Sequence, residues 1–180
     1  REEQEWCEAE RQLTRCLGDR KFEQAEKLTD YLEKNLERTS DRRSLKMEEQ
    51  YLRFAKVLIQ EHRGERTEQV LEELLEIIRM TMPDFDGIHI RTRLLTYHEI
   101  VILNSIGCTY HNLKKLWEGL QLLFELKEYI ENHTLKGEEM AVKYPMIVYN
   151  LSSWLGQEGR YQDALNLCQA GIEYCIEYGK

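Results

Sequence analysis

Residues 149–165 read YNLSSWLGQEGRYQDAL, and this stretch is the clearest helical hairpin in the sequence. A first helix is predicted to end at Gly159, because glycine lacks a Cβ and readily adopts the left-handed conformation that ends many helices. Tyr161 is predicted to start a second helix and to insert between the two. Ala164 and Gly171 are small, so we expect the helices to approach each other closely at both positions.

A weaker form of the same second-helix pattern recurs three times upstream, at Phe22–Ala25, Thr67–Val70 and Trp117–Leu120. The second members of these pairs and Ala164 are separated by 45, 50 and 44 residues. A helix, a Gly-x-Tyr turn and a second helix with a small residue together resemble the tetratricopeptide repeat (TPR), whose standard length is roughly 34 residues. Ser152 departs from that pattern, since it occupies the place of the usual first-helix glycine. The resemblance implies stacked hairpins with lengthened helices.

Apolar residues recur at three- and four-residue steps through most of the chain, which favours helices over strands. Glycine, proline and short polar clusters divide this pattern into eight predicted helices. Their ranges are 1–17, 21–38, 41–62, 65–81, 88–111, 114–133, 138–158 and 161–178. The linkers are short, so successive helices are expected to pack antiparallel. The predicted fold is all-α, a TPR-like superhelix of about four antiparallel hairpins that forms one domain over residues 1–180.

Composition narrows the function classes. The chain has 180 residues, a formal net charge of −8 and only two prolines. Its acidity argues against direct binding of nucleic acid, which needs clustered Lys and Arg. No apolar run approaches the roughly 18 residues of a transmembrane helix. The five cysteines show no metal-ligand spacing, and reduced thiols suit a cytoplasmic protein. Cys168 and Cys175 are two helical turns apart, and we interpret them as small members of a buried apolar stripe.

Catalytic and metal-ligating patterns are missing from the sequence. None of the five histidines forms a ligand-spaced pair, and no nucleophile elbow, glycine-rich phosphate loop or dinucleotide fingerprint occurs. Cys108 and His111 are one helical turn apart, but the sequence indicates no third group that would orient them. We therefore expect a protein that is not an enzyme and that uses no cofactor and no metal.

The candidate binding residues are polar and aromatic side chains on predicted first helices, which line the concave surface of stacked hairpins. They are Tyr97, Asn104, His111, Tyr149, Asn150 and Ser153. Asparagine amides suit a clamp on the main chain of an extended peptide, and tyrosines add contact area at low entropy cost. Arg53 and Lys56 form a polar stripe for an acidic group or a carboxyl terminus. The alternative is that the asparagines only bridge adjacent hairpins and that the tyrosines belong to the core.

The long hairpins, the Pro83-Asp84-Phe85-Asp86 stretch leading into Leu94-Leu95-Thr96-Tyr97, and the asparagine-bearing first helices resemble the C-terminal regions of Gram-positive bacterial regulators of the Rgg, PlcR and Rap type. The resemblance implies a region that dimerises and binds a short signalling peptide, with Asn104 and Asn150 on the peptide backbone. It implies DNA binding only through an N-terminal helix-turn-helix domain, which this sequence lacks. The chain is thus expected to be a fragment of a cytoplasmic transcription regulator, working as a homodimer without contact with membranes.

Two other classes stay open at this point. The hairpins suit a scaffold module that binds a partner protein without any signalling peptide. They also suit an accessory domain attached to an enzyme. A helix-turn-helix encoded directly upstream would favour the regulator, whereas a catalytic domain there would favour the accessory role.

Overall fold

The computed structural model describes residues 2–36, 42–90, 94–133 and 138–178. These residues form eight α-helices and contain no β-strand, which confirms the all-α prediction. The chain divides into two compact units, residues 1–84 and residues 85–180, hereafter the first and the second unit. Each unit is described by itself.

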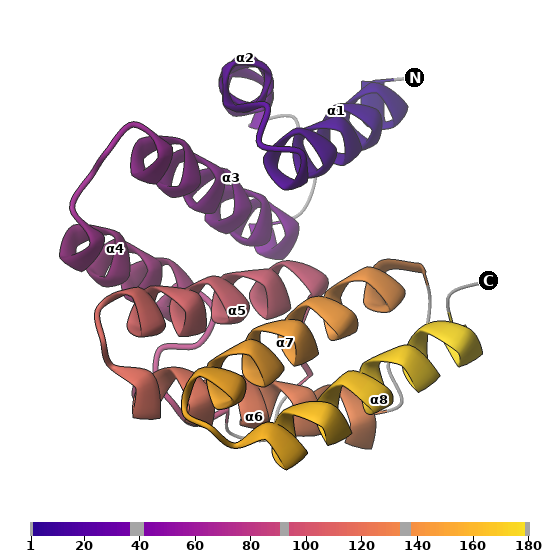
Figure 1. Cartoon of the computed structure of the whole chain (residues 1–180). Helices are drawn as coiled ribbons and strands as arrows, with labels where there is room; N and C mark the ends of the chain where they lie inside the picture. The colour runs from indigo at the N-terminus through magenta and orange to yellow at the C-terminus, as the bar shows by residue number, and fades with distance from the viewer. Residues whose placement is uncertain (1, 37–41, 91–93, 134–137, 179–180) are drawn as a thin grey trace. The chain divides into compact units, whose positions relative to one another are not determined.

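The first unit contains α1 (Glu2–Gly18), α2 (Phe22–Asn35), α3 (Arg42–His62) and α4 (Thr67–Arg79), and each helix packs against the next (Figure 1). One face of each helix is apolar and supplies the core. Its fully or almost fully buried side chains include Leu13, Ala25, Leu32, Phe54, Val70 and Leu74. Ala25 and Val70 are positions that the repeat pattern marked, and both are completely inaccessible to solvent.

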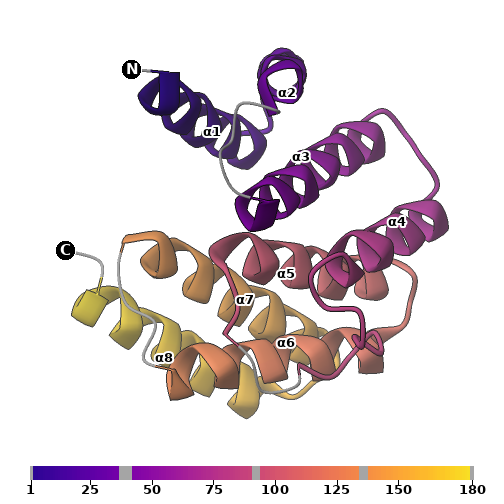
Figure 2. The same ribbon diagram turned by 180° about the vertical axis from the view of Figure 1, so that it is seen from behind.

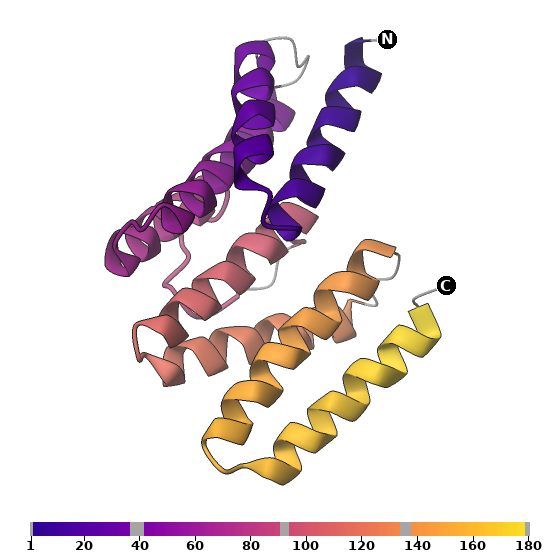
Figure 3. The ribbon, with the colours of Figure 1, turned by 45° about the horizontal axis from the view of Figure 1, so that its top comes forward.

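The second unit contains α5 (Tyr97–Asn112), α6 (Leu116–Asn132), α7 (Glu138–Gln157) and α8 (Tyr161–Tyr178) (Figure 2). Each helix packs on its successor, and α7 also contacts α5. Figure 3 shows α7 in orange and α8 in yellow side by side as a hairpin. The core is aliphatic and includes Ile102, Leu103, Ile106, Leu122, Leu126, Ile147 and Leu151.

The four turns that connect α1 to α2, α3 to α4, α5 to α6 and α7 to α8 share one backbone design. In each, an amide N–H donates to the carbonyl five residues earlier, as in a Schellman motif. The four bonds run from Lys21 to Cys16, Glu65 to Gln60, Lys115 to Tyr110 and Arg160 to Leu155, at 2.8 to 3.2 Å. The residue before each donor has a positive φ, and these residues are Arg20, Gly64, Lys114 and Gly159. They are spaced by 44, 50 and 45 residues, so the turns recur at nearly the same interval as the sequence pattern.

The start of α5 differs from the prediction. The helix expected over 88–111 begins at Tyr97, because an Asx turn at Asp86 and a capping box at Thr96 fix the residues before it in a non-helical conformation. The Asp86 Oδ1 atom accepts the N–H groups of Ile88 and His89 at 3.0 and 2.8 Å. Thr96 Oγ1 accepts the Glu99 N–H at 3.2 Å, and Glu99 Oε2 accepts the Thr96 N–H at 2.7 Å. The other predicted helices agree with the described boundaries to within about three residues.

The role predicted for Tyr161 is wrong, because its side chain is 70% exposed instead of inserted between helices. Trp117, the equivalent residue of the preceding hairpin, is 71% exposed. Phe22, the equivalent residue of the first hairpin, stacks on His62 at the end of α3, with ring centroids 4.1 Å apart. The prediction for Gly171 is confirmed: a Cβ added there would lie 3.3 Å from Val148 Cγ1, so α7 and α8 are in close contact.

Candidate functional site

Four of the residues predicted to line a concave surface lie in the second unit along the seam between α5 and α7, namely Tyr97, Asn104, His111 and Asn150. Near one end the Lys143 ammonium lies 5.7 Å from the centre of the Tyr97 ring, a cation–π contact. In the middle the Asn150 amide donates to Asn104 Oδ1 at 3.4 Å and to Cys108 Sγ at 3.3 Å. These side chains come from the first helices of two successive hairpins, as the repeat pattern predicts.

The other end of the seam is aromatic. His111 stacks on Trp154 with ring centroids 4.5 Å apart and an interplanar angle of 5°. Trp154 also lies close to α6, since a Cβ added at Gly119 would be 3.4 Å from its ring. His111 is therefore held between hairpins by packing.

The arrangement of the two asparagines favours the bridging alternative over a peptide clamp. Asn104 is buried, and the Asn150 amide points to it rather than to solvent. The bond to Asn104 is long for an N–H···O bond and sulfur is a weak acceptor, so each bond is weak, but together they join α5 to α7. A peptide backbone would have to displace these contacts before it reached the Asn150 amide.

The remaining candidates lie in different surroundings. Ser153 is half-buried on α7, and Tyr149 is 70% exposed, so Tyr149 is not part of the core. Arg53 and Lys56 belong to the first unit. The Arg53 guanidinium lies 3.7 Å from Glu76 and 3.6 Å from Met80 Sδ, and the Lys56 ammonium lies 2.5 Å from Glu33. Both are surface ion pairs of small energetic value.

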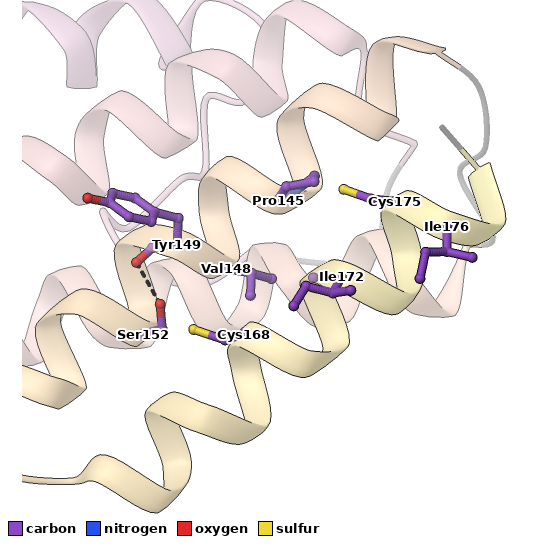
Figure 4. A pocket seen from close by; sticks show the side chains of 9 residues that line it. Pro145, Val148, Tyr149, Ser152, Cys168, Ile172, Cys175 and Ile176 are labelled. Carbon is purple, nitrogen blue, oxygen red and sulfur yellow. Dashed lines mark hydrogen bonds between the residues drawn. The ribbon is translucent and has the colours of Figure 1, made fainter. Parts of the chain in front are cut away.

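An apolar groove of about 530 Å³ runs between α7 and α8. Figure 4 shows its two walls, with Pro145, Val148, Tyr149 and Ser152 on α7 and Cys168, Ile172, Cys175 and Ile176 on α8. The polar Ser152 hydroxyl is turned back to its own helix, where it donates to the Tyr149 carbonyl at 2.9 Å. Ile172 and Ile176 are 61% and 69% exposed. The groove therefore offers solvent a nearly continuous apolar surface.

This groove was missed because the stripe that forms it was interpreted as core. Leu165, Cys168, Ile172 and Cys175 recur at helical spacing, and such periodicity marks an apolar face without saying what covers it. In the structure Cys168 and Cys175 are exposed free thiols, so their predicted burial is wrong. Leu167 and Gly171 are buried, and they form the side of α8 that packs inward.

Ionisable groups with shifted pKa values are present in both units. Burial lowers the pKa of His98 to about 4, so this histidine is neutral at pH 7. In the first unit, burial and the nearby Glu10 carboxylate raise the pKa of Glu48 from 4.5 to about 7, while the Trp6 indole opposes the shift. Among the described residues, no group of three His, Cys, Asp or Glu side chains is placed to hold a metal ion.

Replacing Glu48 with glutamine is expected to change the pH dependence of stability. Because the folded pKa lies above the unfolded one, the native state loses stability as the pH rises from 4.5 to about 7. Glu48→Gln removes this loss, so the variant should gain about 1 kcal/mol over the wild type above pH 7 after allowance for solvent screening.

Urea denaturation at about pH 5 and pH 8 measures the effect of this substitution. Glu49→Gln is the matched control, because the adjacent Glu49 side chain is exposed. A wild type and a Glu48→Gln variant with parallel pH profiles would contradict the assignment.

Comparison with protein-family models, with curated proteins and with solved structures finds no match to this chain. None of the described helices has the length and apolar character that a membrane span requires.

Proposed function

We propose that this chain is a ligand-sensing and protein-interaction module of TPR-like hairpins, and that its second unit binds an apolar polypeptide segment in the groove between α7 and α8. The observation that carries the proposal is the cluster of large apolar side chains at this groove: Tyr149, Ile172 and Ile176 are each more than 60% exposed. Proteins rarely leave several large apolar side chains exposed around one groove unless these side chains meet a partner.

The packing of the preceding hairpin favours a helix as the occupant. α7 packs against both α5 and α6, so a third helix covers one side of the α5–α6 hairpin. The α7–α8 hairpin offers an apolar groove between its two helices. An amphipathic helix with apolar residues at three- and four-residue steps would fill it in the same way. The bridged state of Asn104 and Asn150 makes a clamp on an extended peptide the weaker alternative.

An acidic residue in the groove is expected to abolish binding. The probe is a fluorescein-labelled amphipathic peptide of about 18 residues with leucines at helical spacing, and its binding is followed by fluorescence polarisation. Ile172→Asp should weaken binding at least about tenfold, because bound peptide would desolvate the new carboxylate.

Leu94→Asp is the matched control, since Leu94 is 81% exposed and lies outside the groove. It should bind the probe like the wild type. Equal affinities of the wild type and the Ile172→Asp variant would contradict the proposal. Self-association that Ile172→Asp abolishes, without any binding of the probe, would assign the groove to a second copy of the chain.

The resemblance to regulators of the Rgg, PlcR and Rap type supports a sensory role for this binding. Occupancy of the groove would favour one arrangement of the hairpins over another, which requires that the ligand bind the two states with different affinity. Through an attached DNA-binding domain, or through a homodimer interface, the change would alter transcription. If the gene encodes an attached DNA-binding domain, DNA binding by the encoded protein, measured with and without the helical probe, tests this part of the proposal. Identical DNA affinity at saturating probe would contradict it.

A further inference from the structure

A second groove, of about 280 Å³, lies on the outer face of α6. It is lined by Trp117, Leu120, Gln121, Phe124, Glu125 and Glu128 of α6 and by Arg160, which precedes α8. Trp117, Gln121, Phe124 and Glu128 are spaced by four, three and four residues, so they occupy one face of the helix. Aromatic rings and carboxylates thus face the same space.

The exposed indole is the first sign of a ligand. Trp117 is 71% exposed, although tryptophan has the largest apolar surface of any side chain. A flat ring of this kind stacks well on a guanidinium group and attracts a cation to its face.

The carboxylate of Glu125 is held in place before any ligand arrives. Glu125 Oε2 accepts the Ile90 N–H at 2.6 Å, and its other oxygen lies 3.9 Å from His89 Nε2. His89 is oriented in turn, with Nδ1 2.9 Å from Asp86 Oδ2 and Nε2 3.0 Å from the Gln121 amide nitrogen. The hydrogen bonds from the backbone N–H groups of His89 and Ile88, together with the His89 ring, hold the pKa of Asp86 well below its usual range. A carboxylate fixed in this way loses little entropy on binding a cation.

Among the described residues that line this groove, the basic one is Arg160, and it is engaged with a neighbouring carboxylate. Arg160 contacts Asp163 Oδ2 with both Nε and Nη2 at 2.7 Å, which directs its charge toward the first turn of α8. Glu128 also lines the groove and is exposed. The carboxylates of Glu125 and Glu128 therefore give the groove negative charge, which complements a positively charged ligand.

We propose that this groove binds an arginine side chain of a partner polypeptide. The guanidinium stacks on Trp117 and donates to Glu125 and Glu128, while the aliphatic stem packs on Phe124. Arginine suits the site better than lysine, because its planar group can stack on a ring and bind a carboxylate at the same time. The site is separate from the apolar groove between α7 and α8 and does not depend on the function proposed above.

Saturation-transfer NMR on N-acetyl-arginine amide tests this proposal with the intact chain. The neutral isostere N-acetyl-citrulline amide is the matched probe, because it keeps the shape and loses the charge. The arginine amide should bind saturably, and the citrulline amide at least about tenfold more weakly. Trp117→Ala and Glu128→Gln should each weaken arginine binding by at least about fivefold.

Glu118→Gln is the control variant, since Glu118 is on the same helix but does not line the groove. Ile172→Asp should also bind arginine amide normally, so a failure of this proposal is distinguishable from a failure of the apolar groove. Equal binding of the citrulline and arginine amides would overturn the proposal. Binding that is unaffected by Trp117→Ala and Glu128→Gln would overturn it as well.

Discussion

Gly107→Val is expected to lower the free energy of unfolding of the second unit by about 3 kcal/mol. Gly107 lies on α5 where α6 comes closest: a Cβ added to it would be 2.7 Å from Leu123 Cδ2 and 2.9 Å from Leu123 Cγ. Leu123 is completely buried, and side chains in a close-packed core can shift only at a cost in free energy. The two methyl groups of valine add further overlap, so α5 and α6 must separate.

Thermal unfolding followed by circular dichroism measures this change, and the melting temperature should fall by at least about 10 °C. Gly156→Ala is the matched control in the same unit. No atom lies within 4 Å of a Cβ added at Gly156, so alanine there should raise stability by about 0.5 kcal/mol through its higher helix propensity. Equal melting temperatures for the wild type and Gly107→Val would show that the helices are further apart than described.

Tyr144→Ala is expected to destabilise the second unit by about 3–5 kcal/mol, because it removes a large buried side chain and leaves a cavity. Tyr144 is only 2% exposed, and its ring stacks on Tyr174 of α8 with centroids 4.1 Å apart. Its hydroxyl donates to Glu131 Oε1, which also accepts from Lys127 at 2.8 Å. One side chain thus links α7 to both α6 and α8.

Tyr144→Phe separates the two contributions of this side chain. Phenylalanine keeps the ring stack and loses only the hydrogen bond to Glu131, so its cost should be about 1–2 kcal/mol. Urea denaturation of both variants gives the comparison. If phenylalanine cost as much as alanine, the hydrogen bond rather than the buried ring would hold these helices together.

Loss of the α7–α8 contact in Tyr144→Ala should also weaken binding of the helical probe.

The repeat was detectable in the sequence because hairpin turns depend on local chemistry. Gly159 and Gly64 adopt the positive φ that their residue type favours. Arg20 and Lys114 adopt the same conformation without this advantage, so their residue types did not mark these two turn positions in the sequence. The late start of α5 was also readable in principle, since Thr96 and Glu99 have the spacing of a capping box.

The binding residues were less predictable, because periodicity identifies an apolar face but not its neighbour. Leu167 and Gly171 face the interior while Ile172 and Ile176, on the same helix, face solvent. The two asparagines were placed on the correct helices. Whether their amides face a ligand or each other depends on how closely α5 and α7 pack, and residues 46 positions apart in the sequence carry no signal of that distance.

Local propensity and periodicity were sufficient to predict an all-helical chain, the recurrence of four hairpin turns and most helix boundaries, because each depends on residues within a few positions of one another. Three properties emerged only from the packed helices: the bridge between Asn104 and Asn150, the open apolar groove on α8, and the aromatic and acidic groove on α6. Each of them depends on which helix faces pack together and which are left uncovered. That outcome is a property of the packed assembly of helices, since burial is shared among side chains that are distant in sequence.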